Sequence, residues 1–269
     1  MQSPVVRNRF LLLRSPWRDI LQFAALIAVV LWLMSLSTAR LGYKWAWYRV
    51  PKYLFTEVEG RLVAGPLVDG LLFTLKISGV SLVLAFAIGL VTALLRLSNS
   101  FMGRAVARVY LEIIRNTPLV VQLFVVYFIL APILGMERFI SAVLALSLFE
   151  GAYASEVFRG GIVSIQKGQW QAAYSLGLGT VDTYRFVILP QAVRRILPPL
   201  TSQAVSLIKD SALVSMVSLT DLTMMAQISI SESFLTFEIW FVTAAMYLAI
   251  TVTLSLIVSR MEQRFKILT

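Results

Sequence analysis

The 269-residue chain contains no cysteine and no histidine. It therefore has no disulfide, no thiolate or imidazole metal ligand, and no catalytic arrangement that depends on either group. Charge is also scarce, since only 14% of residues are charged and 24 Lys and Arg face 14 Asp and Glu. A typical soluble domain is about a quarter charged. We expect no catalytic residue and no metal site in this chain.

Apolar side chains are what the sequence has in abundance. Hydrophobic residues make up 58% of it, and the mean hydropathy is +0.81. This excludes a disordered chain, which needs low hydrophobicity and high charge. We interpret the chain as an all-α integral membrane protein. Its formal charge of +10 then belongs to loops beside the membrane rather than to a nucleic-acid surface.

Six segments are apolar and long enough to cross a bilayer, which takes about 20 helical residues. They lie at about 20–39, 70–95, 116–136, 139–159, 196–220 and 239–259. The first follows a basic start, as the core of a cleaved signal peptide also does. Signal-peptide cores are about 7–15 residues long, and this one is longer. We therefore interpret it as a retained transmembrane helix.

The cations indicate the orientation, because Lys and Arg concentrate in cytoplasmic loops. If both termini are cytoplasmic, 16 of the 24 cations lie in the cytoplasmic segments, which are 1–19, 96–115, 159–195 and 260–269. Segment 40–61 runs against this rule, with five cations among six aromatic residues. It is either an interfacial segment lying on lipid headgroups or a solvated loop.

The chain carries no energy-converting site of its own. It contains neither a G-x-x-x-x-G-K-[ST] phosphate loop nor a G-x-G-x-x-G turn. None of its polar stretches is long enough for a nucleotide-binding domain. Uphill transport would therefore depend on an ion gradient or on a partner.

The largest polar segment, 164–195, is predicted to hold two short helices. Residues 169–176 form the first, which Gly177 stops. Residues 183–189 form the second, which we expect to end at Pro190. Such a knob either docks into a groove on another protein or packs only on its own subunit.

This knob resembles the EAA loop of ABC importer permeases, whose pattern is E-A-A, three residues, Gly, nine residues and I-x-L-P. Gln171-Ala172-Ala173, Gly177 and Val187-Ile188-Leu189-Pro190 stand at these spacings. Gln171 replaces the usual Glu and Val187 the usual Ile. The first departure removes a charge from the expected ATPase contact, whereas the second changes little.

Further motifs narrow the resemblance to the polar amino-acid uptake permeases. Glu112–Gln122 is similar to their E-x-x-R-[GN]-T-P-L-x-x-Q, and Glu150–Ile162 to their G-A-Y-x-x-E-I-F-R-G-G-I stretch. Gly168-Gln169-Trp170 matches their G-Q-W, and Leu207–Leu213 is similar to S-L-I-K-[DN]-[ST]-S-L. The four ordered motifs cover residues of about 70–262.

The resemblance implies a five-helix type I importer core over residues 67–264, preceded by an added segment over 1–66. It implies a second permease subunit, identical or not, and a periplasmic amino-acid-binding protein as partners. It places the chain in the bacterial inner membrane, in contact with lipid. Two ATPase subunits, which bind ATP and Mg²⁺, would dock on coupling loops equivalent to 164–192. This chain would bind no cofactor. The coupling residues implied are Gly168, Gln169, Trp170, Gln171, Ala172, Ala173, Gly177 and Pro190. The rival hypothesis is a self-powered secondary transporter or channel.

Charges inside spans are costly and indicate function. Glu150 is placed near the midplane, with Tyr153 on its face of the helix, whereas Glu156 points to the cytoplasmic end or to another helix. Glu150 and Lys209 could hold the ammonium and the carboxylate of an amino acid. The adjacent Asp210 is a further candidate. An intramembrane ion pair that only fixes helix packing is the alternative.

Two further predictions concern helix geometry. Thr117 and Pro118 lie at the cytoplasmic start of the third span, either as part of a gate or, as we favour, as the cap and first turn of a plain helix. Gly79, Gly89, Gly151 and Ser155 are expected to permit close helix packing, without a chemical role.

Overall fold

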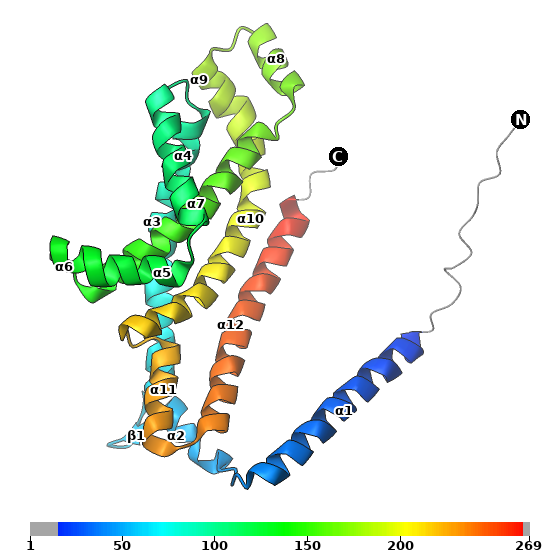
Figure 1. The fold of residues 1–269 in the computed structure, drawn as a ribbon. Helices are drawn as coiled ribbons and strands as arrows, with labels where there is room; N and C mark the ends of the chain where they lie inside the picture. Colours follow the sequence, from blue (N-terminus) through cyan, green and yellow to red (C-terminus); the bar gives the residue numbers. More distant parts are fainter. Residues whose placement is uncertain (1–15, 266–269) are drawn as a thin grey trace, which may run out of the picture. The chain divides into compact units, whose positions relative to one another are not determined.

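The computed structural model describes residues 16–265 and divides the chain into two compact units, 1–46 and 47–269 (Figure 1). In the first unit, α1 (Pro16–Leu41) includes the whole of the predicted segment 20–39. The side chains from residue 20 to residue 30 are exposed, as expected of a helix surrounded by lipid.

The second unit begins with short elements around a hairpin. A 3₁₀ turn, η1 (Trp47–Arg49), and α2 (Pro51–Leu54) lead into strands β1 (Phe55–Val58) and β2 (Arg61–Ala64). The strands are antiparallel and are joined by two residues of positive φ, Glu59 at 51° and Gly60 at 75°. Two such residues form a hairpin turn that matches the strand twist. The all-α prediction is wrong for this hairpin, whose four-residue strands are too short to show a period in the sequence.

Helices α3 (Pro66–Leu97) and α7 (Arg138–Val163) form the central pair of this unit. A Cβ added at Gly89 would lie 2.8 Å from Ala154 Cβ and 3.0 Å from the Gly151 oxygen. The absence of a side chain therefore lets the two backbones approach, which confirms the role expected of Gly89 and Gly151. That expectation is wrong for Gly79, where an added Cβ would meet no described atom within 4 Å.

A sharp bend separates α4 (Phe101–Arg115) from the helical run that follows. This run consists of α5 (Leu119–Phe124), the π-helical turn η2 (Val125–Leu130) and α6 (Ala131–Leu134). The two parts meet at 106°. The predicted span 116–136 is thus wrong in its boundaries, because helix begins only after Pro118 and ends before Gly135, which has a φ of 64°.

The polar segment folds as α8 (Lys167–Ser175), α9 (Thr180–Asp182) and the π-helical turn η3 (Thr183–Ile188). From η3 the chain continues directly into α10 (Leu189–Asp210). The prediction that a helix ends at Pro190 is wrong. The Leu189 N–H donates to the Tyr184 oxygen, five residues back, and this wide turn accommodates a proline in the first turn of the next helix.

The predicted span 196–220 is also wrong in its boundaries and is not one regular helix. It starts within α10 and continues as a 3₁₀ helix, η4 (Ser211–Val217), which ends at Ser218 with a φ of 58°. Helices α11 (Leu222–Ser233) and α12 (Thr236–Phe265) complete the described chain.

Three helices of the described part are long and apolar enough to cross a membrane: α3, α7 and the 236–260 portion of α12. Up to five spans result if each of two bent pairs counts as one, namely α4 with α5–α6, and 180–217 with α11. Within the second unit, α4 and α8 lie at one end and the hairpin at the other (Figure 1).

Candidate functional site

Helix α8 confirms the first predicted helix of the knob, and its end is closed by backbone hydrogen bonds. Gly177 has a φ of 77°, and its N–H donates to the Tyr174 oxygen at 2.9 Å. The Leu178 N–H donates to the Ala173 oxygen at 3.2 Å. This is the Schellman arrangement, which favours glycine at the left-handed position. The glycine of the EAA pattern therefore sets the direction in which the chain leaves α8.

Side chains tie α8 to the following helical run. The Trp170 ring lies edge-on to the Tyr184 ring, with centroids 5.0 Å apart. The Gln191 amide donates to Gln169 Oε1 at 3.1 Å, and Ala173 is buried. Two side-chain contacts therefore hold α8 against η3 and α10.

The rest of the knob surface is exposed and carries polar as well as apolar side chains. Gln171 and Ala172 of the EAA pattern lie on it, whereas Gly168 and Pro190 are exposed at its edges. Large apolar side chains are also exposed: Tyr174 by 48%, Leu176 by 80%, Val181 by 77% and Phe186 by 63%. Four large apolar side chains exposed within one short segment are consistent with a protein interface.

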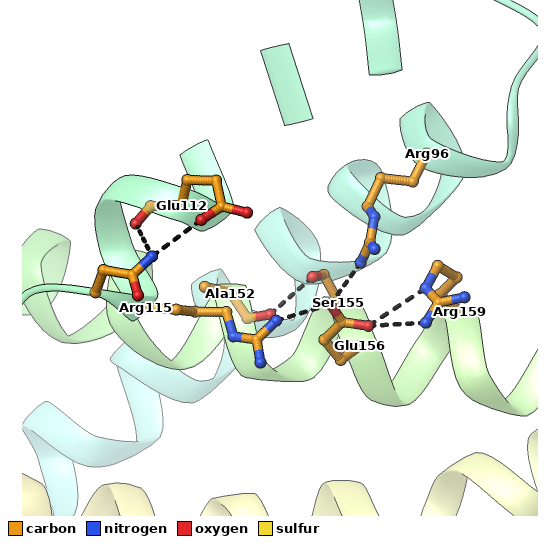
Figure 2. Close-up of polar contacts among 8 residues, drawn as sticks. Arg96, Glu112, Arg115, Ala152, Ser155, Glu156 and Arg159 are labelled. Atoms are coloured by element: carbon orange, nitrogen blue, oxygen red, sulfur yellow. Dashed lines mark hydrogen bonds and ion pairs between the residues drawn. The ribbon is translucent and has the colours of Figure 1, made fainter. Parts of the chain in front are cut away.

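Two turns before the end of α7, Glu156 accepts hydrogen bonds from three arginines (Figure 2). Its carboxylate lies 2.7 Å from Arg96 of α3, 3.0 Å from Arg115 of α4 and 3.1 Å from Arg159 of its own helix. Glu156 therefore makes the inter-helix contact that the sequence left as one of two options.

The corner between α4 and α5 is held by amide and hydroxyl groups. Thr117 Oγ1 donates to the Ile113 oxygen at 2.8 Å. The Gln122 amide donates to the Ile114 oxygen at 2.7 Å and to Thr117 Oγ1 at 2.8 Å. The N-cap of α5 is Pro118, without a side-chain cap, so the favoured role of Thr117 as that cap is wrong. Thr117 closes the end of α4 instead.

The intramembrane carboxyl groups meet one another. Glu150 is buried, with 3% exposed, and its carboxyl group contacts that of Asp210 at the end of α10. Its Oε2 has no hydrogen-bond partner among the described residues. Lys209 is exposed and acts electrostatically on Asp210. The structure thus joins Glu150 to Asp210, with Lys209 next to the pair.

Tyr153 lies with a different group of residues. Arg115 sits over its ring, 6.0 Å from the centroid. Together with Glu112 and Asn116, these two side chains line a polar crevice of about 300 Å³. Tyr153 therefore faces α4, whereas Glu150 faces α10.

The sequence analysis missed Asp221, which is fully buried at the start of α11. Its carboxylate accepts from the Met224 N–H at 2.9 Å and the Thr223 N–H at 3.1 Å. Tyr247 of α12 lies 3.4 Å from the same carboxylate. An acid directly before a helical stretch is an N-cap signal that could have revealed it.

Comparison with known proteins fits this arrangement. Residues 85–267 match the family described as binding-protein-dependent transport system inner membrane component. The chain belongs to this family. The resemblance stated from the EAA loop and its flanking motifs is thereby confirmed, and the permease has the type I importer fold.

Two curated relatives and one solved structure illustrate the similarity. The glutamine transport system permease protein GlnP of Escherichia coli K12 is 40% identical over 205 residues, which is 75% of this permease and 94% of GlnP. The probable glutamine ABC transporter permease protein GlnP of Bacillus subtilis 168 is 39% identical, over 73% and 92% of the two chains. A crystal structure of an amino acid ABC transporter with histidines aligns with a TM-score of 0.70 at 37% identity, over 74% and 94%.

Proposed function

We propose that this chain is the permease subunit of an ATP-driven importer that carries polar amino acids across the bacterial inner membrane. The observation that carries the proposal is α8, a capped helix that exposes Tyr174 and, at its end, Leu176, in a permease whose sequence contains no nucleotide site. Glutamine is the first candidate substrate, because two relatives are named glutamine permeases. The same chemistry would suit other polar amino acids.

The proposed topology has six spans, five in a core at 67–264 and one in the preceding segment 1–66, with both termini in the cytoplasm. The supporting observation is the concentration of 16 of 24 cations in the four segments that this topology makes cytoplasmic. Helix α1 is the sixth span, and its exposed apolar side chains support that role. The hairpin then lies on the periplasmic side.

In the proposed mechanism, two permease subunits pair and each receives one ATPase subunit on α8. ATP and Mg²⁺ bind to the ATPase, and its closure draws the two copies of α8 together. The contacts of Trp170 and Gln169 with α10 support transmission of this movement. Arg195 of α10 also donates to the Ser164 oxygen at 2.6 Å, which joins α10 to the end of α7. The cavity between the subunits then switches from one face of the membrane to the other.

A periplasmic binding protein would deliver the amino acid to the cavity. We place its ammonium near Glu150 and Asp210 and its carboxylate near Lys209, because a zwitterion requires partners of both signs. The buried and unpartnered Glu150 Oε2 supports this assignment. Tyr153 and Thr117 would lie along the pathway, closer to the α4 corner.

Reconstitution tests the function directly. The permease is co-expressed with its cognate ATPase and inserted into vesicles with its binding protein. Glutamine is expected to stimulate both ATP hydrolysis and uptake. Uptake by the permease alone, without ATPase or ATP, would refute the proposal and support the secondary-transporter hypothesis.

Substitution of Gly177 tests the coupling role of α8. Gly177→Val places a β-branched residue at a φ of 77°, a conformation that costs a side chain about 1–2 kcal/mol. We expect the variant to insert normally and to lose most transport while ATP hydrolysis continues. The matched control is Gly179→Val in the same loop, where φ is −70° and an added Cβ meets nothing within 4 Å. Full transport by the Gly177 variant would refute the coupling role.

A further inference from the structure

A polar pocket of about 340 Å³ lies beside α4, between the last turns of α3 and α7. Five arginines and two glutamates line it, so positive charge exceeds negative charge by three. Pockets of about 300 Å³ or more are typical of small-ligand sites. The arginines are Arg96, Arg104, Arg108, Arg115 and Arg159.

Three of these arginines already share the carboxylate of Glu156, and the other two are left over. Arg104 donates only to a backbone oxygen, that of Ser98, at 2.9 Å. Among the described residues, Arg108 has no recorded ion pair or hydrogen bond. The second glutamate, Glu112, accepts from the Asn116 amide. Two exposed guanidinium groups, one helical turn apart, therefore line the pocket without an ion pair among the described residues.

The far side of α4 carries the opposite chemistry. Met102, Val106, Val109 and Ile113 are 68%, 55%, 58% and 58% exposed. They are four, three and four residues apart, which is the spacing of one helix face. The buried residues of α4, such as Leu111, face away from this stripe. A short helix with an apolar face and an arginine-rich opposite face is typical of one that lies in a membrane interface.

We propose that this pocket binds the phosphate of an anionic lipid headgroup at the cytoplasmic membrane surface. The proposal rests on the orientation given under the proposed function. The apolar stripe of α4 enters the acyl region, and Arg104 and Arg108 remain at the depth of the phosphates. Guanidinium groups bind phosphate through two parallel hydrogen bonds, and basic pockets on the cytoplasmic side recognise anionic lipids. A zwitterionic lipid binds more weakly, because its own ammonium offsets the phosphate charge.

The test measures binding to the purified full-length permease, independently of transport. Its thermal unfolding midpoint is followed in an uncharged detergent while phosphatidylglycerol, phosphatidylcholine or inorganic phosphate is added. Phosphatidylglycerol is expected to stabilise the wild type. In the double variant Arg104→Gln/Arg108→Gln, half-maximal stabilisation should require roughly 10- to 30-fold more phosphatidylglycerol. The matched control is Arg61→Gln/Arg138→Gln, which removes the same charge from exposed sites away from the pocket.

Each other outcome has a defined meaning. An equal response of the double variant and the wild type overturns the proposal, and so does equal stabilisation by phosphatidylcholine. Stabilisation by inorganic phosphate at the same concentration assigns the site to free phosphate instead of lipid. The single variant Arg108→Gln provides a second measurement, because no described contact depends on that side chain. If this variant responds to lipid normally but no longer co-purifies with the ATPase, the pocket is an ATPase contact. The lipid-binding result does not depend on the amino-acid transport assay. A failure of that assay would therefore contradict the proposed function and not the lipid site.

Discussion

Glu156 forms ion pairs with arginines of α3, α4 and α7, all within 3.1 Å of its carboxylate. Asp221 accepts hydrogen bonds from the first turn of α11 and from a tyrosine of α12. At the scale of single residues, one carboxylate is thus enough to join several helices. The two differ in burial, since Asp221 is fully buried and the Glu156 side chain is 29% exposed.

Glu156→Gln should weaken the junction of α3, α4 and α7. The change keeps the shape but leaves three arginines close together without a negative charge. We expect a loss of about 1–3 kcal/mol of stability, reduced by solvent at the exposed Arg115. The measurement is the midpoint of detergent-induced unfolding, with the exposed Glu137→Gln as control. If both variants unfold at the same midpoint, the network does not stabilise the junction.

Asp221→Ala should destabilise the start of α11 more than Ser100→Ala destabilises the start of α4. Both residues cap a helix, and Ser100 Oγ accepts from the Gly103 N–H at 3.0 Å on an exposed surface. Losing an exposed cap costs about 1 kcal/mol, and the buried cap should cost about 2–3 kcal/mol because its N–H groups cannot turn to water. Thermal unfolding of the two variants compares them. Equal midpoints would contradict the expected effect of burial.

At the scale of elements, contact between helices decides which glycines are required. Gly160 and Gly161 are neighbours in α7, yet a Cβ added at Gly161 would overlap Ile196 Cγ1, whereas one added at Gly160 would meet nothing within 4 Å. Gly161 therefore permits the approach of α10 to α7. Gly160 permits no such approach, because no described atom lies near its Cα on the side where a Cβ would stand.

Gly161→Ala should therefore destabilise the permease by about 1–3 kcal/mol, because the buried Ile196 must move. Gly160→Ala should be neutral or stabilising by up to about 1 kcal/mol, since alanine favours helix. Unfolding midpoints separate the two variants. Gly161→Ala/Ile196→Ala should cost less than the two single changes added together. Strict additivity would show that the two positions do not clash.

At the scale of the whole molecule, the absence of cysteine makes the topology directly measurable. Single cysteines at Ser175 in the knob and at Glu59 in the hairpin turn are introduced into a chain that has no other. A membrane-impermeant maleimide should label Glu59→Cys in intact cells and Ser175→Cys only in inverted vesicles. Labelling of both from one side would overturn the six-span topology.

Much of this molecule could be predicted from the order of its residues. The apolar runs, the first helix of the knob with its stop at Gly177, and the family motifs depend on neighbours within a few turns, which are visible in the sequence. The prediction failed at Pro190, Pro118 and the 3₁₀ helix after Asp210, where a helix changes its width or direction. Proline indicates a disturbance, but the surrounding packing decides whether the helix ends, widens or bends.

The sequence by itself determined the class of the protein, its family and the position of helix α8, because hydropathy and local hydrogen bonding are properties of short segments. Only the tertiary structure decided which charges meet. Glu156 and Arg96 are 60 residues apart, and Glu150 finds Asp210, across the polar segment, as its partner. No short pattern encodes such pairs, since they depend on how α3, α4, α7 and α10 pack. The same packing placed Arg104 and Arg108 in a pocket beside Glu156, whose carboxylate already pairs with three other arginines.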